Sequence, residues 1–179
     1  MHRYVSRLFA AVVVTLVPAV ASAQEEGKVG ITMGFPETVG LVWHATPNVA
    51  VRPEVSFSWS SSDQDLVDTS GTVLSTGVSA LFYVKRLDRL ATYVSPRYSF
   101  RHTSTSFEGP LGEDAESRSR AHLFSGSFGA QYWLGERFSL FGELGLAYVR
   151  SSAGDEGDGD DPTANQVGTR SAVGVVFYF

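Results

Sequence analysis

Apolar and polar residues alternate with a period of two along most of the chain. Over residues 49–60, for example, Val, Pro, Phe and Trp occupy the odd positions, while Arg52, Glu54 and serines occupy even ones. Successive side chains of a β-strand point to opposite faces, so this pattern predicts strands with one apolar and one polar face. It recurs in eight segments, which cover residues 28–35, 39–44, 49–60, 74–85, 93–101, 124–132, 140–148 and 172–179.

The connections between these segments alternate in length. Transmembrane barrels have short turns on one side of the membrane and long loops on the other, and strands of about 9–11 residues cross it at a tilt. The pattern predicts an all-β fold, an eight-stranded antiparallel up-and-down transmembrane β-barrel, with a short outer turn at Pro36–Glu37. The other expected short connections are 46–48, 87–90 and 135–137, and the expected long outer loops are 61–71, 108–117 and 152–165.

The N-terminal residues have the features of a cleaved secretory signal peptide. Two arginines precede a short apolar run at residues 8–17, and Ala21-Ser22-Ala23 has the small-x-small form of a cleavage site. The apolar run is too short for a membrane-spanning helix, which needs about 20 residues. We expect removal of residues 1–23 and one barrel domain formed by residues 24–179.

Composition excludes several classes of protein. Cysteine is absent, which rules out disulfides and attachment of a lipid to an N-terminal cysteine. The sequence has 14 Lys and Arg against 19 Asp and Glu; without Arg3 and Arg7 the balance is 12 against 19, a net charge of −7. A nucleic-acid-binding protein would show a basic stripe, and this sequence has none, so we expect no nucleic-acid partner.

The C-terminal segment resembles the assembly signal of outer-membrane barrels. In that signal the chain ends in Phe, with a hydrophobic residue two positions earlier and a Gly five positions before the end. Phe179, Phe177 and Gly174 match this pattern, although Ala172 stands where a polar residue is usual. This similarity predicts recognition by the barrel-assembly machinery.

Together with residues 47–57, these features resemble the outer membrane protein beta-barrel domain family, the small eight-stranded group that includes the OmpA membrane domain and OmpX. The resemblance covers essentially the whole expected mature chain. It implies an eight-stranded barrel in the outer membrane of a Gram-negative bacterium. Members of the family have several different roles, so the resemblance does not determine a function.

Charged residues occupy the polar faces of the predicted strands, which would line the lumen. Eight strands enclose an interior that side chains just fill, and an unpaired buried charge is costly, so we predict that these charges pair. Glu143 in particular should contact Arg52, Arg97 or Arg170. The alternative is a gated ion path. The predicted lumen cluster is Arg52, Glu54, Arg97, Arg101, Glu143 and Arg170, with Lys85, Gln131, His44 and Tyr83 also facing inward.

Two other motifs carry possible chemistry. His102 and Ser104 lie on one face of a predicted strand, a spacing compatible with a base and a nucleophile, but the sequence assigns no acid to orient the histidine. The acidic run from Asp155 to Asp161 has the oxygen ligands that divalent cations prefer, although a solvated loop is the simpler interpretation.

These observations predict an integral outer-membrane protein with a structural or surface-interaction role through its outer loops. We expect no catalysis, cofactor or metal site, and contacts with outer-membrane lipids and lipopolysaccharide. The alternatives are a narrow pore, a lipid A-modifying enzyme, and a soluble periplasmic barrel of the lipocalin type. The last would need an apolar interior, whereas the predicted inward faces are polar.

Overall fold

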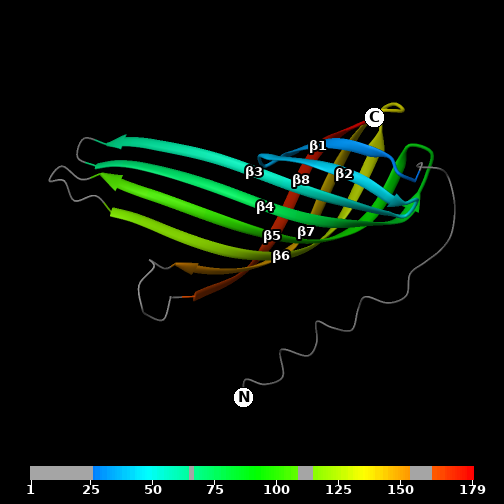
Figure 1. Ribbon diagram of the computed structural model, residues 1–179. Helices are drawn as coiled ribbons and strands as arrows, with labels where there is room; N and C mark the ends of the chain where they lie inside the picture. The colour runs from blue at the N-terminus through cyan, green and yellow to red at the C-terminus, as the bar shows by residue number, and fades with distance from the viewer. Residues whose placement is uncertain (1–25, 65–66, 109–114, 154–162) are drawn as a thin grey trace, which may run out of the picture.

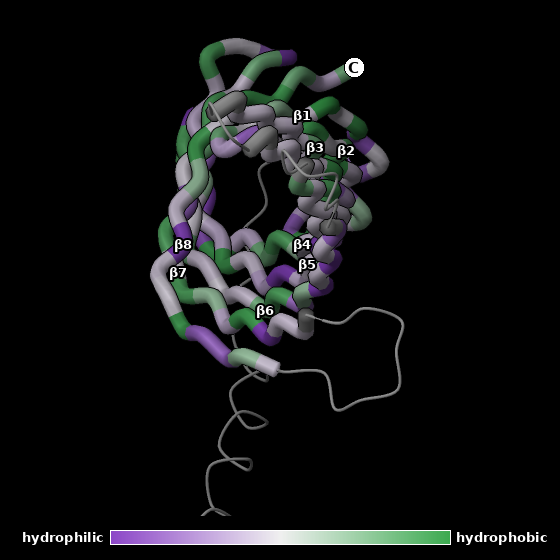
Figure 2. Tube along the Cα trace, turned by 90° about the vertical axis from the view of Figure 1, so that its left-hand side faces the viewer, coloured by the Kyte–Doolittle hydropathy of each residue, from purple (hydrophilic) through white to green (hydrophobic). Residues whose placement is uncertain are grey.

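The computed structural model describes residues 26–64, 67–108, 115–153 and 163–179. Eight antiparallel strands pair in chain order, and β1 closes the ring by pairing with β8, so the predicted fold is confirmed (Figure 1). The view along the barrel shows the ring directly (Figure 2). The strands are β1 (Val29–Phe35), β2 (Thr38–Thr46), β3 (Val49–Gln64), β4 (Val67–Arg86), β5 (Leu90–Glu108), β6 (Ala115–Trp133), β7 (Phe138–Ala153) and β8 (Thr163–Tyr178).

The described residues include no helix that is long and apolar enough to cross a membrane.

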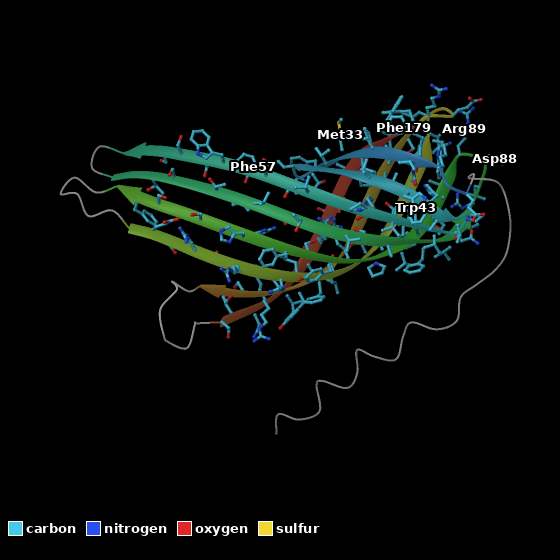
Figure 3. The ribbon with its side chains drawn as sticks, in the orientation of Figure 1. Met33, Trp43, Phe57, Asp88, Arg89 and Phe179 are labelled. Carbon is cyan, nitrogen blue, oxygen red and sulfur yellow. The ribbon has the colours of Figure 1, made fainter. Side chains whose placement is uncertain are left out.

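The alternation in the sequence becomes an outer and an inner face of the barrel. Large apolar side chains point outward and are exposed, for example Phe57 at 63% and Leu144 at 66%, while the polar residues Arg52 and Glu143 are buried inside. Figure 3 shows Met33 and Phe57 pointing away from the wall. A soluble protein rarely exposes a continuous apolar surface of this extent, whereas a membrane barrel presents such a band to lipid.

The two ends of the barrel differ. The connections at residues 47–48, 87–89 and 134–137 lie at one end, here called the short-turn end, where Figure 3 places Asp88 and Arg89. The opposite end is the outer end. The strands run further toward the outer end than predicted, since much of 61–71 and parts of 108–117 and 152–165 form paired strands. Polarity marks where the chain leaves lipid, but a polar segment still pairs as a strand when both neighbours offer partners.

β1 and β2 are short, with 7 and 9 residues. Their hairpin turns back at Pro36 and Glu37, about midway along the barrel in Figure 1, while β3 and β8 continue. The last β3 residue that pairs with β2 is Val55, and Val173 is the β8 residue nearest the outer end that pairs with β1. We call the resulting break in the wall, between β3 residues 56–64 and β8 residues 163–172, the notch.

One predicted inward residue is placed wrongly by the alternation. The register between β4 and β5 shifts between Tyr83 and Lys85, so an extra residue enters β4 at a bulge. As a result Lys85 is exposed, and the next residue, Arg86, lies over the Tyr83 ring with its guanidinium 4.1 Å from the ring centroid. Arg86 also donates a hydrogen bond to the carbonyl of Pro47 in the neighbouring turn.

We predict that Gly145→Ala destabilises the barrel by about 1–3 kcal/mol, the usual cost of overpacking. A Cβ at Gly145 would collide with the backbone of Gly126 and Ser127 on β6, and backbone cannot move aside as a flexible side chain can. Gly126→Ala is the matched control, because its Cβ would meet open space. Urea unfolding in lipid vesicles compares the two variants, and equal stabilities would contradict this close strand contact.

Candidate functional site

Glu143 on β7 is the centre of the charged network in the lumen. Its Oε1 lies 2.6 Å from Arg52 Nη2 of β3 and accepts a hydrogen bond of 3.0 Å from the Tyr93 hydroxyl of β5. Its Oε2 accepts a hydrogen bond of 2.8 Å from Arg170 Nη1 of β8. The glutamate therefore joins strands from opposite sides of the ring, and both of its oxygens are satisfied.

Glu54 on β3 forms the second half of the network. Its Oε1 lies 3.2 Å from Arg52 Nε, and its Oε2 lies 2.5 Å from Arg97 Nη1 of β5. Arg97 Nε also donates to Ser99 Oγ at 2.9 Å. The network thus contains three arginines and two glutamates, which leaves one surplus positive charge in the middle of the barrel.

Arg101 is the one residue of the predicted lumen cluster that does not join this network. It follows Arg97 and Ser99 on the inward-facing side of β5 but lies nearer the outer end, where it is exposed. It makes no ion pair within the described part of the chain. Alternation gives the face of a side chain but not its depth, and at this depth the lumen is open to solvent.

Below the charged network, toward the short-turn end, uncharged polar residues fill the lumen. Gln131 connects them: its Oε1 accepts from the Tyr83 hydroxyl at 2.7 Å, and its Nε2 lies 2.8 Å from the Tyr178 hydroxyl and 2.7 Å from Ser139 Oγ. His44 Nε2 lies 3.2 Å from the same Tyr178 hydroxyl. Alternation along the chain predicted Gln131, Tyr83 and His44 as lumen residues, whereas Tyr178, Tyr93 and Arg86 were not predicted there. Tyr178 and Tyr93 both stand at inward-facing positions of the alternating pattern, which is the feature that could have identified them.

These two layers close the lumen. Tyr93, Tyr178 and His44 have no exposed surface, and Arg52 is only 1% exposed. Between the layers lies an apolar one that includes Val42, Leu81, Phe141 and Val176, and the cavity remaining among these side chains is about 10 Å³. This is about the volume that one water molecule requires.

The outer edge of the apolar band carries aromatic rings with basic residues directly beyond them. Tyr98 on β5 is paired with Phe124 on β6, which is in turn paired with Tyr148 on β7. Further out, His102 is opposite Arg120, and His122 is opposite Arg150. Tyr98 and His122 are linked through the hydroxyl and Nδ1 at 2.8 Å. We call the residues His102, Arg120, His122 and Arg150 the basic patch.

The structure does not support His102 and Ser104 as a catalytic pair. Ser104 Oγ donates to Glu116 Oε1 at 3.1 Å, and no hydrogen bond joins Ser104 to His102 among the described residues. Arg118 also binds Glu116, and its hydrogen bonds, together with that from Ser104, hold the pKa of the carboxyl below its ordinary value. Ser104 therefore donates a hydrogen bond to an ionised carboxylate and not to the His102 ring.

The acidic run from Asp155 to Asp161 lies outside the described residues. Elsewhere in the described segments, no group of three or more acidic or histidine side chains is arranged to hold a metal ion.

The proposed assembly signal lies at the seam of the barrel. Phe179 N donates to the Val29 carbonyl at 3.1 Å, and the Phe177 and Phe179 rings meet edge to face with centroids 5.8 Å apart. Gly174 faces the Phe141 ring so closely that a Cβ there would collide with it and with the Met33 carbonyl. These residues thus join the last strand to the first.

Comparison with known proteins supports the fold. No family model and no curated protein matches the sequence. Among solved structures, a major outer membrane protein from Thermus thermophilus is similar with a TM-score of 0.60 and 13% identity, over 85% of this chain and 98% of that one. Ail, the attachment invasion locus protein of Yersinia pestis, is similar with a TM-score of 0.53 and 12% identity, over 87% and 100%. The chain has the fold of a small outer-membrane β-barrel.

Replacing Glu143 by Ala should destabilise the barrel by about 3–5 kcal/mol, because it leaves the buried Arg52 and the half-buried Arg170 without their common partner. Leu144→Ala is the control at the next position, where the side chain faces outward and loses only lipid contact. Urea unfolding of both variants in lipid vesicles measures the difference. A smaller loss for Glu143→Ala than for Leu144→Ala would mean that water solvates the network.

We predict that deletion of Phe179 impairs assembly of the barrel in cells, since the last strand must be recognised and then joined to β1. The measure is the yield of the compact, heat-modifiable form on gels. Leu134→Ala serves as the control, because Leu134 is an exposed apolar residue in a turn at the same end of the barrel. Normal yield of the truncated protein would show that the chain is not recognised through this residue.

Proposed function

We propose that the protein is an integral outer-membrane barrel that does no catalysis. In this proposal it anchors itself among lipopolysaccharide molecules and presents its outer hairpins for interactions at the cell surface. The observation that carries the proposal is the order of residue types along β5, β6 and β7: an apolar band, then aromatic rings, then the basic patch.

This order matches the layers of an outer leaflet. Aromatic rings are enriched at the membrane interface, where their apolar bodies contact lipid and their polar tips contact water. Arg120 and Arg150 lie beyond the rings and are exposed, so they would lie at the depth of the lipid phosphates. A guanidinium presents a planar set of donors that suits phosphate oxygens. Lipopolysaccharide is the partner that supplies phosphates at this depth.

The filled lumen argues against the pore alternative. A conducting path would have to pass both the Gln131 layer and the Glu143 network, whose side chains are mostly buried and are hydrogen-bonded to one another. Eight-stranded barrels are the size at which side chains alone fill the interior.

The length of the strands supports a role at the surface. β5 and β6 continue as a paired ladder from Arg101 and Ala121 to Phe107 and Ala115, beyond the aromatic rings of the outer band. Outward-facing residues in this extension are polar, including Ser104 and Arg118. A paired ladder is stiffer than a loop, so it would hold the outer connections away from the membrane.

The double variant Arg120→Gln, Arg150→Gln should bind lipopolysaccharide about thirtyfold more weakly. Each arginine near an anionic lipid surface contributes about 1 kcal/mol, and two such contributions correspond to this factor. Titration of the detergent-solubilised protein with fluorescent lipopolysaccharide measures the affinity, and raised salt should reduce the difference because exposed charges are screened.

The matched control is the double variant Arg89→Gln, Arg137→Gln, which removes the same charge from exposed positions at the short-turn end. Equal losses of lipopolysaccharide affinity in both double variants would mean that the effect comes from net charge alone. The basic patch would then have no specific role.

A further inference from the structure

The notch interrupts the barrel wall inside the apolar band. On the β3 side it begins after Val55, and the next outward side chains, Phe57 and Trp59, are 63% and 64% exposed. On the β8 side it extends from Ala172 toward the outer end. No strand pairing joins β3 to β8 among the described residues, and Figure 1 shows the two strands diverging.

Unpaired backbone groups cannot face hydrocarbon. A lipid-exposed strand edge leaves each N–H and C=O without a partner, which costs several kcal/mol per group, so such edges occur only where polar groups reach them. The inner face of β8 in this region is open to solvent, since both Gln166 and Gly168 are exposed. The notch is therefore a polar break in an apolar surface, and it connects the surrounding leaflet to the outer part of the lumen.

A groove on the outer surface leads to the lower end of the notch. It has a volume of about 400 Å³, within the range of small-ligand sites. Its floor is made of small residues, among them Gly142, and its sides carry large apolar side chains, among them Phe128 and Leu144. Phe35 and Pro36 at the tip of the β1–β2 hairpin, Glu143 of β7, and Ser171 to Val173 of β8 complete the lining.

Positive charge lies on the lumen side of the same opening. Arg170 belongs to the part of β8 that does not pair with β1, only three residues from Val173, and its side chain is 20% exposed. Deeper in the lumen, the Arg97 side chain is 12% exposed, whereas the glutamates that bind these two arginines are 0–4% exposed. The accessible surface of the network is therefore cationic, and Arg101 adds another exposed charge toward the outer end.

We propose that the notch and the groove together form a lateral binding site for one anionic lipid of the surrounding leaflet. One acyl chain lies in the groove over Gly142. The phosphate enters the notch on the outer-end side of the β1–β2 hairpin and reaches Arg170. The headgroup also supplies polar partners for the exposed strand edges. This site is distinct from the basic patch, and the proposal does not depend on the patch binding lipopolysaccharide.

The groove is tested with a matched pair of glycines. Gly142→Phe fills the floor of the groove, and Gly126→Phe adds the same ring on the same apolar surface outside it; a Cβ at either position meets open space. Native mass spectrometry of the detergent-solubilised protein with added phosphatidylglycerol measures retained lipid. We expect one tightly held molecule in the wild type and in Gly126→Phe, and at least a tenfold weaker affinity in Gly142→Phe.

The charge is tested at Arg170. Arg170→Gln should lower the affinity for phosphatidylglycerol about tenfold, the effect of losing one charge-assisted hydrogen bond. Arg170→Lys should retain most of the affinity, and Arg89→Gln at the short-turn end should leave it unchanged. The zwitterionic lipid phosphatidylcholine should bind more weakly than phosphatidylglycerol and respond little to Arg170→Gln. Heat-modifiable migration on gels confirms that each variant is folded before its bound phosphatidylglycerol is measured by native mass spectrometry.

Two results would overturn the proposal. Equal lipid retention by Gly142→Phe and Gly126→Phe would mean that lipid binds only as part of the general layer around the barrel. A stable dimer without bound phosphatidylglycerol would mean that a second copy of the chain covers the notch. Loss of lipopolysaccharide binding in the basic-patch variant, with phosphatidylglycerol retention unchanged, would separate this site from the proposed function.

Discussion

Hydrocarbon offers no hydrogen-bond partner to the backbone, and most of this structure follows from that constraint. Every strand that crosses the apolar band must be paired on both edges, so β1 has to meet β8 and the ring must close. Closure with eight strands fixes a narrow interior. The polar side chains that alternation directs inward must then satisfy one another. The network of Glu143 and Glu54 with three arginines is thus a consequence of closure and also ties distant strands together.

The strand assignment and the faces of most side chains were predictable from the sequence. Residues that face lipid must be apolar, so apolar and polar residues alternate clearly along each strand. Alternation also placed Arg52, Arg97, Arg170 and Glu143 on the inner face, and their ion pairs follow from the narrow lumen. Depth was not predictable in the same way. Arg101 has the same parity as Arg97 yet lies where the lumen is open, and only the register across several strands fixes that level.

The errors have two physical sources. At Lys85 a bulge inserts one residue, and every inward and outward assignment after it is reversed, so Arg86 lies inside instead. A bulge leaves little trace in a pattern of only a few residues. The polar ends of β3 to β8 were predicted as loops because polarity was interpreted as irregular structure. Serine and threonine there pair normally once neighbouring strands extend equally far.

The short β1–β2 hairpin departs from the requirement of full pairing inside the apolar band, and its position matters. It leaves the wall complete around the Gln131 layer, where the filled lumen separates the two sides of the membrane. The wall is open from the level of Glu143 outward, because Ala172 and Arg170 lie on the unpaired edge of β8, and the lumen communicates with the outside there. A break at the level of Gln131 would expose the sealing layer to lipid, whereas a break that starts at the level of Glu143 leaves the Gln131 layer enclosed by paired strands. The barrel can therefore combine a closed lumen with a lateral opening, because the two features occupy different depths.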